Sequence, residues 1–387
     1  MRIAFLCSGL EPGADGVGDY TRSLAAACTA LGHETRIAAL RDPKAPARAF
    51  SSSGGEARWN DIFRRPGEER AFAAWLRDFQ PDWVSVQYTP FGFHPRGLGG
   101  ARAQRLRSLL PETAKRHIMY HEIWLQPGLH GRLRHRVLGK LQRPAVLAWG
   151  NKTGFAPSLV HTQARLHKLR LSRGGVEADL LPIFSNLPIT LCEPKRARAM
   201  LLETLRSRES NVHPPDDVDC LWIGHFGTMQ TGLDWDLTVF AREITQIAKR
   251  TGRRACFVAL GRMLHNETAW AAAAAAVPEA FFAATGPLDA KPLVQVMQAC
   301  NVAFSSTPAD IVEKSSANAA WRALKIPLLL PRAGAISASS LEAWPDPGLL
   351  PWPLPGGLMP SGRIAPKLDL SAQAVAETLV TAFKNGR

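Results

Sequence analysis

The sequence lacks any closely spaced pair of cysteines. The six cysteines are Cys7, Cys28, Cys192, Cys220, Cys256 and Cys300. None stands in a Cys-x-x-Cys pair, and most lie inside apolar runs. Zinc sites and disulfide frameworks need such pairs, so the sequence argues against both, and we expect no metal. Unpaired cysteines suit a reducing compartment, which predicts a cytoplasmic protein.

Long apolar runs are also missing. No run approaches the ~20 residues that a membrane-spanning helix needs. The N-terminal run Ile3–Cys7 is too short for the apolar region of a signal peptide and passes directly into glycines and acids. We therefore read it as a first strand. We therefore expect a protein that is soluble or lies on a membrane surface, and the inner membrane surface is one such location.

The familiar nucleotide-binding fingerprints are absent or incomplete. No Walker motif is found, which excludes a P-loop NTPase. The dinucleotide pattern Gly-x-Gly-x-x-Gly begins at Gly16 and Gly18 but has Thr21 in place of its third glycine. Asp42 does follow the second expected strand, where a ribose-binding acid would lie. One matching feature of two disfavours an oxidoreductase without excluding it.

Acidic residues are few compared with basic ones. The chain has 33 Asp and Glu against 47 Lys and Arg, a net charge of +14. This excess favours an anionic partner: phosphates, nucleic acid or an acidic membrane surface. Because no recognition motif and no interleaving of aromatic with basic residues occurs, we expect no nucleic-acid partner.

What is present is an alternation of strands and helices. The first series of expected strands covers 3–7, 35–40, 83–88, 117–120, 158–162 and 178–183, and the second covers 220–227, 255–261, 281–286, 302–305 and 327–330. This alternation indicates βαβ units and parallel sheets. The fold class is therefore α/β, with two Rossmann-like domains facing across a cleft, and the cleft is the expected ligand site.

The expected domain boundaries follow changes in composition along the 387 residues. Residues 1–190 form the N-terminal domain and 191–219 a polar, charged linker. Residues 220–365 form the C-terminal domain. Residues 366–387 form a last helix. One open arrangement is that this helix packs back on the N-terminal domain.

A glycine-rich corner at residues 13–20 joins the first strand to the first helix. Gly16 and Gly18 allow close approach of the backbone to a ligand, and the helix offers free N–H groups and the positive end of its dipole. The corner is thus a candidate anion site; a tight turn without a ligand is the alternative.

A basic amphipathic segment lies at 130–142. Leu129, Leu133, Val137, Leu138 and Leu141 make an apolar stripe with Arg and Lys opposite. The segment could lie on an anionic membrane as a peripheral contact. An ordinary helix with its apolar side in the core is the alternative, and base rates favour it.

Several segments, in the right order, resemble the GT-B-fold retaining glycosyltransferases, in particular a divergent branch of the large family-four-like group. They are residues 16–25, which begin Gly16-Val17-Gly18-Asp19-Tyr20, residues 31–34 and 81–88, Tyr120-His121-Glu122-Ile123-Trp124, Phe226-Gly227 and residues 284–288. The resemblance covers most of 1–330. It differs where the family carries two glutamates eight positions apart: Glu313 is displaced by one, and Ala320 stands at the second position. Gln230-Thr231-Gly232 replaces the family's lysine.

The resemblance implies transfer of a sugar from a nucleotide-diphosphate donor to a saccharide or lipid-linked acceptor, with retention, front-face attack and no cofactor. A non-catalytic nucleotide-sugar-binding or partner protein of the same fold is the alternative, since the second glutamate is missing. By resemblance, His121 contacts the donor sugar near the reacting carbon; a buried, hydrogen-bonded histidine is the other interpretation. Asp19 is placed to bind an acceptor hydroxyl, or else it is an acid favoured at a helix start.

The expected donor-binding residues are Gly16, Gly18, Gly227, Arg262, Glu313, Lys314, Ser315 and Ser316. Lys314, Ser315 and Ser316 directly precede a helix, where hydroxyls can cap it and amides can face phosphate. Arg262 follows a strand-ending glycine, where a phosphate clamp would be useful. The alternatives are an ordinary serine cap beside a solvated lysine, and a surface arginine.

Overall fold

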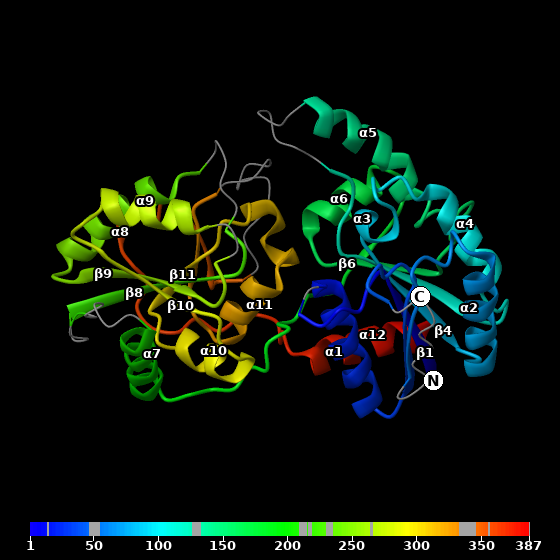
Figure 1. The fold of residues 1–387 in the computed structure, drawn as a ribbon, viewed down its shortest axis with the longest axis horizontal. Helices are drawn as coiled ribbons and strands as arrows, with labels where there is room; N and C mark the ends of the chain where they lie inside the picture. The colour runs from blue at the N-terminus through cyan, green and yellow to red at the C-terminus, as the bar shows by residue number, and fades with distance from the viewer. Residues whose placement is uncertain are drawn as a thin grey trace. The chain divides into compact units, whose positions relative to one another are not determined.

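The computed structural model describes residues 1–13, 15–45, 55–125, 133–208, 215, 219–229, 235–263, 266–332, 346–354 and 357–386. They form two compact units, which we name unit 1 (Met1–Asn186 with Ser371–Arg387) and unit 2 (Leu187–Leu370) (Figure 1). Each unit contains one parallel sheet with helices in the connections. The predicted α/β fold with two Rossmann-like domains is confirmed.

The sheet of unit 1 has the strand order β3-β2-β1-β4-β5-β6-β7. Its strands are β1 (Arg2–Cys7), β2 (Glu34–Ala39), β3 (Glu56–Arg58), β4 (Trp83–Tyr88), β5 (Lys115–Tyr120), β6 (Leu159–Thr162) and β7 (Asp179–Leu180). All six residues of β4 are buried, as expected for a strand covered on both faces. The strand order reverses between β1 and β4. In parallel sheets, ligands bind beyond the carboxyl ends of the strands at such a reversal.

The helices of unit 1 are α1 (Gly16–Ala30), α2 (Pro66–Phe79), α3 (Pro90–Phe93), α4 (Gly100–Leu109), α5 (Leu133–Leu147), α6 (Arg165–Ser172) and α12 (Ala372–Asn385). In α1, Leu24, Ala25 and Cys28 are buried on one face, so the helical spacing seen in the sequence points to the core.

The C-terminal helix α12 is part of unit 1. It is capped by the Ser371 hydroxyl and ends at Gly386 in the left-handed conformation. Its Phe383 ring stacks on Trp83 of β4 at 4.2 Å and meets the edge of His117 of β5 at 5.3 Å. The helix lies beside α1 (Figure 1). Residues from the two ends of the chain therefore share one core.

The sheet of unit 2 has the order β10-β9-β8-β11-β12-β13. Its strands are β8 (Cys220–Phe226), β9 (Arg254–Leu260), β10 (Phe281–Gly286), β11 (Val302–Phe304), β12 (Leu328–Leu330) and β13 (Leu349–Pro351). Its helices are α7 (Pro194–Arg208), α8 (Leu237–Arg250), α9 (Glu267–Ala276), α10 (Ala290–Met297), the 3-10 helix η2 (Ala309–Lys314) and α11 (Ser316–Ala323). In the described part of the chain, no helix combines the length and apolar character that crossing a bilayer requires.

Helix α11 is fixed to the sheet of unit 2 by two contacts. A Cβ on Gly224 of β8 would lie 2.6 Å from the Trp321 ring and 2.7 Å from the Cys300 sulfur, so only glycine admits Trp321 there. Arg322 is buried, and its Nε and Nη2 each lie 2.6 Å from one oxygen of Asp346.

Three segments differ from the sequence-based expectations. The region 42–66, where the sequence predicts no strand, contains the edge strand β3, and the expected strand at 178–183 shortens to the two residues of β7. The helix that the sequence predicts at 197–206, within the stretch expected as linker, is present as α7. Its Ala197, Leu201 and Leu205 are buried in the core of unit 2, so the helix is part of that unit. The apolar residues recur every four positions, which gives this polar segment one core-facing side.

Replacing Phe383 tests the dependence of unit 1 on the C-terminal helix. Phe383→Ala should lower the free energy of unfolding by about 3–5 kcal/mol, because it removes a buried ring between two strands and leaves a cavity. Urea unfolding followed by tryptophan fluorescence measures this. Phe91→Ala, which truncates an exposed ring of α3, should change it by less than about 0.5 kcal/mol. Equal effects of the two substitutions would contradict the account.

Candidate functional site

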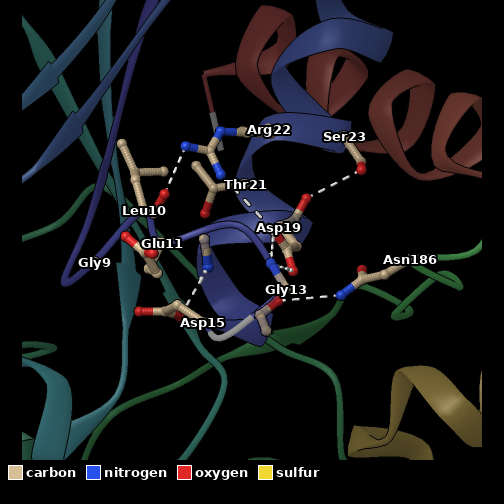
Figure 2. A network of polar contacts seen from close by, with 12 residues as sticks. Gly9, Leu10, Glu11, Gly13, Asp15, Asp19, Thr21, Arg22, Ser23 and Asn186 are labelled. Atoms are coloured by element: carbon tan, nitrogen blue, oxygen red, sulfur yellow. Dashed lines mark hydrogen bonds and ion pairs between the residues drawn. The ribbon is translucent and has the colours of Figure 1, made fainter. Parts of the chain in front are cut away.

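The glycine corner of unit 1 is closed by its own side chains. Asp15 caps α1, and its Oδ1 accepts hydrogen bonds from the amides of Val17 and Gly18, both at 3.0 Å (Figure 2). Burial raises the pKa of Asp15, and the hydrogen bonds from the Gly18 and Val17 amides lower it. The predicted anion at this helix start is thus a carboxylate of the chain itself, and an external phosphate would have to displace it.

The two glycines of the corner have different surroundings. A Cβ on Gly18 would lie 2.5 Å from the Gly9 carbonyl oxygen, so this glycine lets the loop after β1 rest on α1. A Cβ on Gly16 would meet no atom within 4 Å. The Gly16 carbonyl accepts a hydrogen bond from the Asn186 amide at 3.2 Å. Close packing within unit 1 therefore accounts for Gly18, whereas space remains beside Gly16.

Asp19 holds the loop before α1. Its Oδ2 accepts from the Gly13 amide at 3.1 Å, and its Oδ1 lies 3.7 Å from Arg22 (Figure 2). Arg22 also donates to the Leu10 carbonyl at 2.7 Å and pairs with Glu56. A sugar-acceptor hydroxyl bound at Asp19 would share its carboxylate with the Gly13 amide and the Arg22 guanidinium.

His121 follows β5 directly and is only 4% exposed. Its Nε2 lies 2.9 Å from Oε1 of Gln87. The Gln87 amide nitrogen donates to the Ser85 hydroxyl at 2.8 Å, so the Gln87 oxygen must face His121. Because a carbonyl oxygen only accepts, Nε2 of His121 carries the proton, and Nδ1 keeps its lone pair.

The polar chain continues away from His121 inside the sheet. The Ser85 hydroxyl lies 2.8 Å from Nδ1 of His117, and Nε2 of His117 lies 3.0 Å from Nδ1 of His161. With the Gln87 amide donating to Ser85, the consistent direction is that Ser85 donates to His117 and His117 donates to His161. Such a chain fixes the orientation of Gln87 and, through it, of the His121 ring.

Burial lowers the pKa of His121 to about 3, so the ring is neutral at physiological pH. The edge of His121 meets the Tyr20 ring at 4.8 Å, and Tyr20 stacks on Phe184. A neutral ring with a bare Nδ1 can accept a hydrogen bond from a hydroxyl. It cannot serve as a cationic group or as a general acid near neutral pH.

In unit 2, the end of β8 lies against the start of α11. Gly227 has φ of 100°, and a Cβ there would lie 3.1 Å from the Cβ of Ala317. The Ser315 hydroxyl caps α11 by accepting from the Asn318 amide at 3.3 Å. The first amides of a helix have no partner within it, so those of Ser316 and Ala317 remain available beside Gly227.

The charges around the start of α11 favour an anion. Lys314 ends η2, immediately before the cap, and residues 313–317 are all half-buried. A lysine at a helix N-terminus opposes the dipole, and α11 has no acid in its first turn. Both the dipole and the lysine would attract an anion bound there. Glu313, which also lies in η2, adds one negative charge nearby.

Three neighbouring strands of unit 2 end in glycines with positive φ: Gly227 after β8, Gly261 after β9 and Gly286 in β10. Packing explains why position 286 is a glycine, because the Arg208 guanidinium occupies the space that a Cβ would need. Arg262 follows Gly261 and is exposed. The structure thus brings Gly227 against Ala317, which directly follows Ser315 and Ser316 in the sequence. Arg262 lies at the end of the neighbouring strand β9.

Several polar residues of these sites were missed in the sequence. Ser85 and Gln87 alternate within the apolar run of β4, a pattern that should have indicated a polar chain inside the sheet. His225 precedes Phe226 at the end of β8. Its Nδ1 lies 3.2 Å from the Phe304 carbonyl, and its buried Nε2 has no hydrogen-bond partner among the described residues. Burial lowers the pKa of His225 to about 4. Across the described residues, no three His, Cys, Asp or Glu side chains are grouped to hold a metal ion.

No protein-family model matches the chain, and no curated protein sequence does. Solved structures do match. The UDP-GlcNAc 2-epimerase from Methanocaldococcus jannaschii has a TM-score of 0.52 at 12% identity, covering 100% of both chains. The catalytic domain of starch synthase IV from Arabidopsis thaliana, bound to ADP and acarbose, has a TM-score of 0.53 at 11% identity, covering 100% of this chain and 92% of that one. At these identities the likeness shows the fold alone: the chain has the GT-B fold.

Gln87→Glu tests the hydrogen bond that fixes His121. Wild-type His121 should show a protonated Nε2 at pH 7 in histidine ring ¹⁵N spectra and stay neutral until the pH approaches about 3. A carboxylate at position 87 should raise the His121 pKa by roughly 1–3 units, because it favours the charged ring. Gln104→Glu on exposed α4 should leave the His121 pKa unchanged. A wild-type His121 protonated on Nδ1, or titrating near pH 6.5, would contradict the assignment.

Proposed function

We propose that the protein binds a nucleotide-diphosphate sugar and transfers the sugar to a saccharide or lipid-linked acceptor, with retention at the anomeric carbon. The observation that carries the proposal is the close approach of Gly227 to the first turn of α11, beside Lys314. A helix start with a nearby cation binds phosphate, and it can stabilise a departing diphosphate without a metal. The GT-B fold is compatible with this chemistry.

The proposed roles follow the surroundings of each residue. Ser316 and its neighbouring amides, with Lys314, hold the donor diphosphate, while Ser315 caps α11. His121 accepts a hydrogen bond from a hydroxyl of the donor sugar through Nδ1. We keep Asp19 as the proposed acceptor contact, and Glu313 and Arg262 as further donor contacts. The proposed location is the cytoplasm, at the inner membrane surface, with peripheral contact through residues 130–142; of these, 130–132 lie outside the described residues.

A second candidate function is binding without catalysis, as a nucleotide-sugar sensor or partner subunit. The observation that favours it is Ala320, which stands where the related glycosyltransferases carry their second glutamate. Ala320 is 0% exposed and lies in the core of unit 2. A glutamate there would have to bury its charge in apolar surroundings, so the chain has no room for that group in its present packing.

Thermal shift measurements test donor binding. A panel of UDP-, GDP- and ADP-linked sugars should include one that raises Tm by about 5 °C at a hundredfold excess over its Kd. Lys314→Ala should remove most of the shift, and Lys314→Arg should keep part of it. The control Lys291→Ala, at an exposed position on α10, should respond like wild type. A panel without any shift would remove the main support for the proposal.

Product analysis separates the two candidate functions. The donor with the largest shift is incubated with saccharide and lipid-linked acceptors, and the products are followed by NMR. Transfer with retained anomeric configuration supports the enzyme. Binding without transfer or donor hydrolysis supports the non-catalytic candidate, and conversion of the free donor into an epimer would refute both. Lys314→Ala serves as the matched control, since it should lower any turnover that depends on the donor.

A further inference from the structure

Helix α5 presents an apolar stripe to solvent. Leu133, Val137 and Leu141 are 74%, 49% and 56% exposed. Residues four apart lie on one side of a helix, so the three side chains form a continuous line. The interpretation of this segment as a helix with its apolar side in the core does not hold for these residues.

The opposite side of α5 is anchored to unit 1, which fixes the outward direction of the stripe. Gln142 is buried, and its side chain accepts from the Leu125 amide at 2.8 Å and donates to the Arg96 carbonyl at 2.9 Å. A Cβ on Gly139 would lie 2.0 Å from the Leu125 carbonyl oxygen, so the helix backbone rests directly on that segment. The helix cannot rotate its leucines inward without breaking these contacts.

Basic residues flank the stripe on both sides. At 100° per residue, Arg134 lies beyond Leu141 on one side, and Lys140 and Arg136 lie beyond Leu133 on the other. Within the described chain, these three side chains form no ion pair or hydrogen bond. The helix contains no Asp or Glu. An apolar line between two rows of cations is the pattern of a helix that lies in a membrane interface.

The charge of the whole chain is concentrated around this helix. Residues 91–173 contain 16 of the 47 Lys and Arg residues and only 2 of the 33 Asp and Glu residues. This one segment therefore carries a net charge of +14, equal to that of the whole chain, and the rest of the chain has 31 basic and 31 acidic residues. Some of these cations pair with acids elsewhere in unit 1, as Arg102 does with Asp61 and Arg105 with Glu69. Among the described residues, Arg134, Arg136 and Lys140 of α5 pair with no acid, so they can meet an external partner.

We propose that this face of α5 docks on the surface of an anionic lipid bilayer. The stripe would lie at the boundary of headgroups and acyl chains, and Arg134, Arg136 and Lys140 would meet lipid phosphates. A nucleic acid would match the cations but leave the three apolar side chains in water. A second copy of the same face would bring like charges together. The bilayer is the partner that satisfies both parts of the pattern.

Flotation of the full chain with vesicles tests the proposal. The vesicles are phosphatidylcholine alone or phosphatidylcholine mixed with phosphatidylglycerol, and no sugar nucleotide is added, so the result is independent of the proposed transfer. The first variant, Leu133→Gln with Val137→Gln and Leu141→Gln, removes the stripe. The second, Arg134→Gln with Arg136→Gln and Lys140→Gln, removes the flanking cations. All six substituted positions are exposed, and both variants keep the anchoring residues Gly139 and Gln142.

Matched controls carry the same changes elsewhere. Leu191→Gln, Leu358→Gln and Leu368→Gln replace exposed leucines of unit 2, and Arg70→Gln, Arg77→Gln and Lys291→Gln remove three exposed cations. Circular dichroism and melting curves verify that each variant is folded.

The wild type and both controls should float with the anionic vesicles and much less with neutral ones. Loss of the three cations should weaken the partition by about a hundredfold, since each basic residue near the surface contributes roughly 1 kcal/mol. Loss of the stripe should weaken it by at least tenfold. Equal binding to neutral and anionic vesicles, or variants that bind like their controls, would overturn the proposal. A third contradicting outcome is a wild type that binds duplex DNA in a gel-shift assay but not vesicles, with DNA binding removed by the cation variant and kept by the stripe variant.

Discussion

The contact of Trp321 with Gly224 determines where helix α11 begins. With any side chain on Gly224, a Cβ would lie 2.6 Å from the Trp321 ring, and the helix would have to move away from β8. In the observed position, the first turn of α11 meets Gly227, and the buried pair of Arg322 with Asp346 holds the other end. The amides at the helix start are therefore preorganised before any ligand arrives. The proposed donor site depends on this arrangement, because phosphate stabilisation by fixed dipoles requires that they do not reorganise on binding.

The two units use their helix starts differently. In unit 1, Asp15 supplies the anion that α1 attracts, so the corner after β1 is electrostatically complete. In unit 2, α11 has an uncharged serine cap and a lysine just before it. The cap of α1 is thus a carboxylate and the cap of α11 an uncharged hydroxyl, which is why we place the proposed donor diphosphate at the start of α11. His121 belongs to the first unit and is neutral there, which suits a contact with a sugar hydroxyl better than a role in proton transfer.

Local patterns in the sequence were sufficient for the two parallel sheets, for His121 at the end of a strand and for Ser315 at a helix start. Each of these depends on neighbouring residues and on the periodicity of strands or helices. The hydrogen bond of Gln87 with His121 joins residues 34 positions apart, and the pairing of Arg322 with Asp346 spans 24. Neither leaves a local signal. Asp15 could have been recognised as a cap from its position before Gly16, but its effect on the predicted anion site required the geometry. The exposure of the α5 stripe likewise depends on how Gly139 and Gln142 anchor the helix.

A crystal structure with a bound nucleoside diphosphate tests the central claim most directly. The nucleoside is the one whose sugar-linked form gives the largest thermal shift. The account predicts that the diphosphate lies at the start of α11, with its oxygens within hydrogen-bond distance of the amides of Ser316 and Ala317 and near Lys314. Asp15 should remain on the amides of Val17 and Gly18. A diphosphate that instead displaced Asp15 at the start of α1, or that bound away from Gly227, would contradict the account.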